Sequence, residues 1–173
     1  CGTLYIAFWV LGSKKYESKR VVKNLKAKPM PLKEALMTFS NLALYLIPIS
    51  LSLILEKTFG YTVRYESFWE FGLVYAILSL FLMIFMVDTN FFWIHKWMHE
   101  KRIKAHFSHH VFVNPTPWAA YGVHLFEGFL LSLPYYIILL FIPWHAWTLL
   151  ALSLFAFFYN SFIHLGFDPI PNS

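Results

Sequence analysis

The chain has 173 residues, of which 58% are hydrophobic and only 13% are charged, and its mean hydropathy is positive. A soluble domain carries nearer to about a quarter of charged residues, so this composition excludes an ordinary water-soluble domain and indicates a membrane protein. The single cysteine, Cys1, excludes a disulfide framework and a cysteine-based zinc site within the chain. The first residue is not methionine and nothing recognisable as an end precedes Ser173, so we expect the chain to be a fragment of a longer protein.

Apolar segments alternate with polar ones along the chain. We expect residues 1–12 to be the end of a transmembrane helix and residues 13–33 to be a basic loop, with eight lysines and arginines against one glutamate. Residues 34–55 and 71–92 are each long enough to cross a hydrocarbon core of ~30 Å as a helix. Residues 93–122 form a histidine-rich region, and residues 123–163 are two apolar stretches joined at Pro143, which predicts a tight helical hairpin. The sequence therefore predicts one all-α, multi-pass membrane domain over residues 1–173.

The basic residues indicate how this domain is oriented. If successive loops face opposite sides, residues 13–33 and 93–122 share one face and hold eight and four of the fourteen lysines and arginines. This bias predicts that the shared face is cytoplasmic, in the endoplasmic reticulum or in a bacterial inner membrane. The basic loop is interpreted as a solvated flank and not as a nucleic-acid site. His124 and His164 would return to the cytoplasmic face, whereas His145 would lie at the far turn as a satisfied core residue.

The histidines predict a metal site. Five of the eight fall within sixteen residues, as His95-x3-His99 and His106-x2-His109-His110. Residues three or four apart share a helix face, and so many imidazoles beside a membrane are costly without a partner. Imidazole suits zinc, copper, iron and nickel, but one catalytic zinc usually takes only three protein ligands. Six or seven histidines therefore indicate two metals, and two histidine-held irons beside lipid indicate oxygen chemistry.

The pattern around these histidines resembles a known family. Asp88-x4-Trp93-x-His95-Lys96-x2-His99, followed by His106-x2-His109-His110, resembles the fatty acid hydroxylase and sterol desaturase superfamily of integral-membrane di-iron oxygenases. The resemblance continues through NPTPWAA (114–120), HLFEG (124–128) and Asn160-x3-His164, and is closest to sterol C5-desaturases. It covers residues 88–171, and the last HxxHH of the family is absent from this sequence.

The resemblance implies a ligand set, a reaction and partners. The implied metal ligands are His95, His99, His106, His109, His110, His124 and His164. Asp88 and Asn160 would orient these ligands without binding the metal themselves. The implied cofactors are two iron ions with O2 as co-substrate, and the implied enzyme desaturates or hydroxylates a C–H bond of a membrane lipid or sterol in lipid biosynthesis. Electrons would come from a separate cytochrome b5- or ferredoxin-like reductase system. Four basic residues, Lys96, Lys101, Arg102 and Lys104, would attract such a donor, although contact with phospholipid headgroups explains them equally well.

Three other functions remain open at this point. The nearest is a fatty acid or other lipid hydroxylase of the same superfamily. A membrane b-type cytochrome would also use histidines, but its haem ligands should lie on facing helices in mid-membrane. A non-catalytic metal-binding protein or pseudoenzyme would keep the fold without the reaction.

Overall fold

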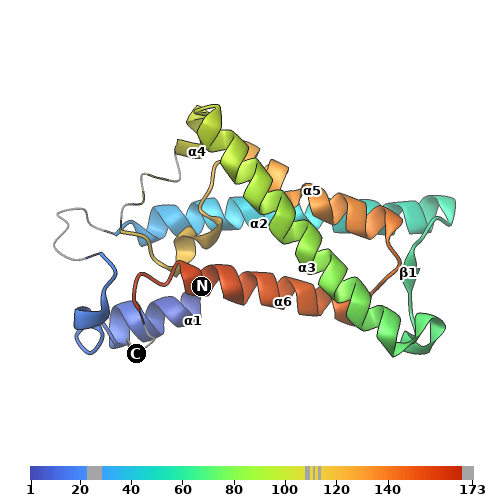
Figure 1. Cartoon of the computed structure of the whole chain (residues 1–173), viewed down its shortest axis with the longest axis horizontal. Coiled ribbons are helices and arrows are strands. Elements are labelled where there is room, and N and C mark those ends of the chain that lie inside the picture. The colour runs from blue at the N-terminus through green and yellow to red at the C-terminus, as the bar shows by residue number, and fades with distance from the viewer. Residues whose placement is uncertain (23–28, 108–109, 111, 113, 169–173) are drawn as a thin grey trace.

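The computed structural model describes residues 1–22, 29–107, 110, 112 and 114–168, and most of them are helical (Figure 1). The elements in chain order are α1 (Gly2–Leu4), the π-helical η1 (Tyr5–Leu11), the 3-10 turn η2 (Glu17–Lys19), α2 (Pro31–Phe59), β1 (Arg64–Tyr65), α3 (Phe68–Glu100), α4 (Lys104–Phe107), the 3-10 turn η3 (Pro117–Tyr121), α5 (Leu125–Phe141), β2 (Trp144–His145) and α6 (Ala146–Ile163). The predicted all-α membrane fold is confirmed.

Three helices, α2, α3 and α6, are long and apolar enough to cross a membrane, and α5 is a shorter apolar helix. Much of their apolar surface faces outward: Leu78, Phe85 and Phe158, for example, are all more than half exposed. Large apolar side chains in such numbers on the outside of a bundle are stable only where lipid covers them.

The longest helix, α3, reaches well past the predicted span of residues 71–92. Ser67 caps its start by accepting a hydrogen bond from the Trp69 N–H at 3.3 Å, and Gly72, at φ +79°, kinks the first turn. No glycine or proline follows until the helix ends at Glu100. Its 33 residues correspond to about 50 Å at ~1.5 Å per residue, which exceeds a hydrocarbon core of ~30 Å. His95 and His99 are therefore carried on the rigid extension of a membrane helix.

Helix α2 buries a polar stripe and not an apolar one. Glu34, Thr38 and Asn41 share one face and are almost completely buried. Glu34 accepts hydrogen bonds from the backbone N–H and the hydroxyl of Thr116, and the Thr38 hydroxyl donates to the Trp118 carbonyl. These contacts hold the loop that leads into η3 against α2, because buried polar groups are stabilised by hydrogen-bond partners.

Asn41 continues the stripe to the start of α5. Its side-chain amide donates to the carbonyls of Tyr121, at 3.1 Å, and Val123, at 2.7 Å. Gly128 lets the two helices approach this closely, because a Cβ at that position would lie 1.8 Å from Asn41 Oδ1.

The two ends of the bundle have different roles. At one end, β1 pairs in parallel with β2 and ties the loop before α3 to the junction before α6 (Figure 1). His145 belongs to this end: its Nε2–H donates to the Glu66 carbonyl at 2.9 Å, and its Nδ1 accepts from the Trp147 N–H at 3.2 Å. Both ring nitrogens are used, as expected for a structural histidine. At the other end lie α4, η3 and both termini of the described chain.

The segment over residues 123–163, for which the sequence predicts a tight helical hairpin, forms two apolar helices, α5 and α6, joined through β2. Helix α5 packs mainly against α2 and α3, whereas α6 packs against α3 and η3. Strand β2 lies at the junction between them, and Leu139 of α5 and Leu152 of α6 belong to the same buried core cluster. A cavity remains between these two helices and α3.

Candidate metal centre and lipid cavity

The metal centre begins with the turn that ends α3. The Ile103 N–H donates to the Met98 carbonyl at 3.0 Å and the Arg102 N–H to the His99 carbonyl at 3.1 Å, which is the Schellman pattern of helix ends. Arg102 occupies the left-handed position of this motif, at φ +50°. The turn reverses the chain, so that α4 returns over the end of α3 and brings His106 back to His99.

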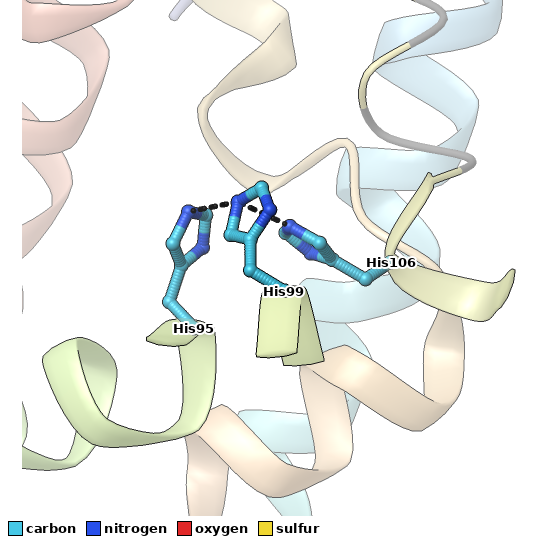
Figure 2. A group of neighbouring side chains, drawn as sticks. All are labelled: His95, His99 and His106. Atoms are coloured by element: carbon cyan, nitrogen blue, oxygen red, sulfur yellow. Dashed lines mark hydrogen bonds between the residues drawn. The ribbon is translucent and has the colours of Figure 1, made fainter. Parts of the chain in front are cut away.

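Three imidazoles meet at this reversal (Figure 2). Nε2 of His99 lies 3.1 Å from Nε2 of His95, one turn earlier on α3, and 3.1 Å from Nε2 of His106 on α4. Nε2 of His110 lies 2.9 Å from the same Nε2 of His106. His106 is completely buried and lies at the centre of the group.

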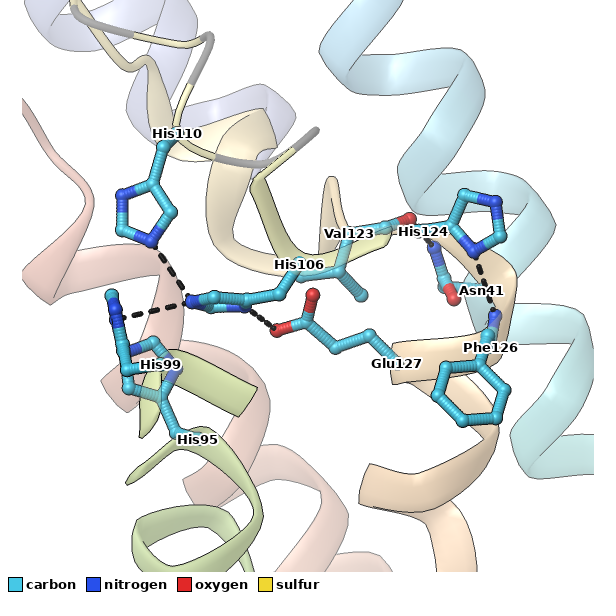
Figure 3. A network of polar contacts seen from close by, with 9 residues as sticks. All are labelled: Asn41, His95, His99, His106, His110, Val123, His124, Phe126 and Glu127. Carbon is cyan, nitrogen blue, oxygen red and sulfur yellow. Dashed lines mark hydrogen bonds and ion pairs between the residues drawn. The ribbon is translucent and has the colours of Figure 1, made fainter. Parts of the chain in front are cut away.

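Glu127, at the start of α5, holds the opposite nitrogen of His106. Its Oε1 lies 3.0 Å from His106 Nδ1, and both side chains are buried (Figure 3). In its ionised form the Glu127 carboxyl only accepts hydrogen bonds, and the His106 proton then lies on Nδ1 and the lone pair on Nε2, toward His99 and His110. A carboxylate behind a metal-binding histidine orients its ring in just this manner.

The arrangement fits a metal ion. One nitrogen from each of His95, His99 and His106 lies within 4.8 Å of the others. An imidazole nitrogen binds a first-row metal at roughly 2.1 Å, so two ligands at right angles lie roughly 3.0 Å apart. The observed Nε2 separations of 2.9 to 3.1 Å match this spacing. The pKa of His110 is lowered by desolvation and then by the nearby His99, which favours the neutral, metal-binding form.

The structure places the other predicted ligands in different ways. His109 lies outside the described residues. His164, which ends α6, donates its Nδ1–H to the Asn160 carbonyl at 2.9 Å, so its Nε2 carries the lone pair. Burial lowers the pKa of His164, and its ring lines the same cavity as His95. It is not one of the three histidines that lie within 4.8 Å of one another.

His124 is not brought to the cluster. Its Nδ1 accepts the Phe126 N–H at 3.1 Å and so caps α5, and its ring is exposed. Figure 3 shows it on the far side of Glu127 from the other histidines.

A cavity of about 640 Å³ lies between α3, α5 and α6 and reaches the metal centre at His95, Glu127 and His164. Its walls are mainly aromatic and aliphatic side chains, among them Phe81, Leu131 and Phe155. The size falls within the range of roughly 300–1,000 Å³ that is usual for sites that enclose a small ligand. Asp88, two turns before His95 on α3, also lines the cavity.

Asn160 supports the cavity wall through its side chain. The amide donates to the Ala156 carbonyl at 2.8 Å, and its side chain is hydrogen-bonded to Tyr121. These bonds occupy Asn160 and place it between η3 and His164. The two residues predicted to support the ligands, Asp88 and Asn160, thus both lie in the wall of the cavity.

The turn at Arg102 can be tested by a matched pair of substitutions. Glycine adopts positive φ without strain, whereas a β-branched side chain does so at a cost of roughly 1–2 kcal/mol. We expect Arg102→Gly to keep the metal content and melting temperature of the wild type and Arg102→Val to lower both, because only valine forces the turn open. Both changes remove the same charge. Equal metal content and melting temperature in the two variants would show that the turn does not position His106.

A substitution can decide whether His124 acts as a helix cap or as a metal ligand. Asparagine is also a good N-cap, so His124→Asn preserves the start of α5 while removing the imidazole. We expect the metal content to stay within about twofold of the wild type. A stoichiometric loss of metal, measured by plasma emission spectroscopy on the purified protein, would instead make His124 a ligand.

Two parts of the site were missed by the sequence reasoning. Glu127 was noted only as part of a recurring motif, yet it is a buried acid in the first turn of an apolar helix, which is itself a functional signal. The stripe formed by Glu34, Thr38 and Asn41 was read as part of an apolar span. Its helical spacing could have identified it as a buried polar face.

The site and fold together define an integral-membrane helical protein with a histidine cluster at one end of a largely apolar cavity. The model of the fatty acid hydroxylase family matches residues 80–172, more than half of the chain, and the chain belongs to this family. It is 32% identical over 139 residues to the Delta(7)-sterol 5(6)-desaturase erg31 of Schizosaccharomyces pombe, covering 79% of this chain and 45% of that protein.

Two mammalian relatives match the chain with similar identity and coverage. The chain is 32% identical over 143 residues to the lathosterol oxidase of Rattus norvegicus, covering 80% of this chain and 48% of the relative. It is 31% identical over 127 residues to the lathosterol oxidase of Homo sapiens, covering 71% and 42%. The chain thus spans about half the length of the curated relatives it matches. No solved structure matches it. The predicted membership of the superfamily, with sterol desaturases among its relatives, is confirmed.

Proposed function

We propose that this protein is an O2-dependent, di-iron membrane oxidoreductase that introduces the 5(6) double bond into a Delta(7)-sterol. The activities for which its relatives are named, a Delta(7)-sterol 5(6)-desaturase and lathosterol oxidases, suggest the substrate and the bond. The observation that carries the proposal is the joint position of His95, which belongs both to the histidine cluster and to the wall of the apolar cavity. A lipid in that cavity would lie directly beside the metal centre.

The histidines that would hold iron are His95, His99, His106 and His110 in the described cluster, together with His109 and His164. When bound, iron would supply the activation of O2 for attack on an unactivated C–H bond. The overall reaction balances as follows: two hydrogens leave adjacent carbons of the substrate with two electrons, a donor adds two electrons and the medium two protons. One O2 then leaves as two waters.

The residues of the chain itself would position the metal ligands and enclose the lipid substrate. Glu127 keeps the proton of His106 on Nδ1 and thereby fixes the direction of its Nε2 lone pair. The aromatic and aliphatic walls of the cavity exclude water and hold the lipid in one orientation. Positioning of this kind is worth a large share of the rate, because a misplacement of ~1 Å can cost on the order of 100-fold.

The proposed electron donor would dock near the end of α3, on the face we propose to be cytoplasmic. Lys96 is engaged there, 3.8 Å from Glu100 and over the ring of Trp93. Lys101 and Arg102 are exposed and follow the last turn, beside the histidine cluster. Two exposed positive charges so close to the metal centre suit the approach of an acidic redox protein.

The experiment is complementation. The full-length protein is expressed in yeast cells that lack their own sterol 5(6)-desaturase and accumulate Delta(7)-sterols. We expect a conjugated 5,7-diene, detected by its ultraviolet absorbance and by mass spectrometry of the extracted sterols. Cells that express the His106→Ala variant at the same level should show none. Unchanged sterols together with newly hydroxylated fatty acids would replace this proposal by the fatty acid hydroxylase alternative.

A further inference from the structure

The cavity carries a polar patch apart from the metal centre. Three tyrosines from three elements meet in its wall: Tyr45 of α2, Tyr121 of η3 and Tyr135 of α5. The ring of Tyr45 stands edge-on to both others, with centroids 6.2 Å from Tyr121 and 5.1 Å from Tyr135. This tyrosine cluster brings together residues 45, 121 and 135, and most of the other groups that line the cavity are apolar.

Two of the three hydroxyls are available to a ligand. Tyr121 is hydrogen-bonded to the side chain of Asn160. The hydroxyls of Tyr45 and Tyr135, by contrast, make no hydrogen bond to any residue in the described part of the chain. Neither hydroxyl is among the fully enclosed polar atoms without a partner, so both keep accessible surface, and both residues line the cavity. Two such phenols in a mainly apolar wall indicate a polar group of the ligand.

The charges of the wall decide which polar group this is. Among the described residues that line the cavity are two acids, Asp88 and Glu127, and neither a lysine nor an arginine. A fatty acid carboxylate or a phosphate would find no lysine or arginine to pair with among these residues, in surroundings of low dielectric. A neutral hydroxyl can both donate to and accept from tyrosine hydroxyls.

We propose that Tyr45 and Tyr135 bind the hydroxyl group of a neutral lipid alcohol and so determine both the class of substrate and the carbon that faces His95. This inference rests on the proposed function in taking the cavity as the substrate site. Most of the remaining wall is apolar, and apolar contacts allow a long lipid to slide. A pair of directional hydrogen bonds at one point of the cavity removes that freedom.

The test is equilibrium binding to the full-length protein in lipid nanodiscs, without reductant, so that no turnover occurs. The probes are radiolabelled lathosterol, its 3-deoxy analogue and oleic acid. We expect lathosterol to bind at least roughly tenfold more tightly than the deoxy analogue, as two hydrogen bonds of ordinary strength require, and oleic acid to bind at least tenfold more weakly than lathosterol. In the Tyr45→Phe/Tyr135→Phe variant the preference for lathosterol over the deoxy analogue should approach one.

The matched control is Tyr136→Phe, the neighbouring tyrosine on α5, which does not line the cavity and should keep the full preference. If the double variant is unstable by its melting curve, the two single variants should each lose part of the preference. An undiminished preference in the Tyr45 and Tyr135 variants, equal binding of oleic acid, or no binding of lathosterol by the wild type would overturn the inference. Preserved hydroxyl recognition without any sterol oxidation would instead reject only the proposed function.

Discussion

Replacing His106 by alanine should remove the bound iron and abolish product formation. His106 is the residue that the others surround: its Nε2 lies within 3.1 Å of Nε2 of His99 and 2.9 Å of Nε2 of His110, and Glu127 holds its Nδ1. Loss of a group behind a ligand typically costs 10–100-fold in metal affinity, so we expect loss of this central ligand to cost more than roughly 100-fold. The measurement is iron per protein by plasma emission spectroscopy, alongside product formation in the complementing cells.

The control for His106→Ala is His145→Asn at the other end of the bundle. His145 is also buried, and asparagine can still cap α6, but this position does not contact the histidine cluster. Its iron content should equal that of the wild type. If His106→Ala retains iron and activity while remaining in the membrane, the cluster is not a catalytic metal centre and the non-catalytic alternative applies.

Replacing Ala156 by phenylalanine should abolish most sterol turnover while leaving the metal centre intact. Ala156 lines the cavity from α6, and a phenyl ring there would occupy space that the lipid needs. We expect kcat/KM to fall by roughly 100-fold, because even a small displacement of the reacting carbon is this costly. Iron content should be unchanged, since Ala156 contacts Asn160 only through its carbonyl.

Ala151→Phe supplies the matched control. Ala151 lies on the same helix but is exposed and does not line the cavity, so the added ring would face lipid. Its kcat/KM should stay within about twofold of the wild type. Equal loss in the two variants would attribute the effect to α6 itself, and no loss in Ala156→Phe would mean that the substrate does not enter this cavity.

Some features of this protein could be predicted from local sequence because they depend on local physics. Runs of about 20 apolar residues specify membrane helices regardless of their neighbours, since backbone groups in lipid must be satisfied within the segment. The spacing of His95 and His99 puts both on one helix face, because residues four apart lie one turn apart. The two-nitrogen use of His145 also followed from its place at an isolated turn far from the other histidines.

Other features depended on residues far apart in sequence. The helix α3 continues beyond the span of residues 71–92 expected within the membrane, through residues 93–100, and ends at the turn at Arg102. The burial of the polar stripe of α2 could not be predicted from neighbouring residues, because its partners lie some 80 residues later in the chain, at Thr116, Trp118 and Tyr121. A segment that looks apolar overall can bury its few polar groups when another segment satisfies them.

The sequence by itself determined that this is a helical membrane protein with a histidine-rich site, because composition and short-range spacing suffice for both. Only the tertiary structure decided which histidines converge, that Glu127 orients His106 while His124 caps a helix, and that a lipid-sized cavity opens between α5 and α6. Those outcomes follow from the reversal of the chain after α3 and from the packing of α5 and α6 on α3, with α2 beside α5 and η3 beside α6. Both arise from contacts between distant segments, which no local pattern encodes.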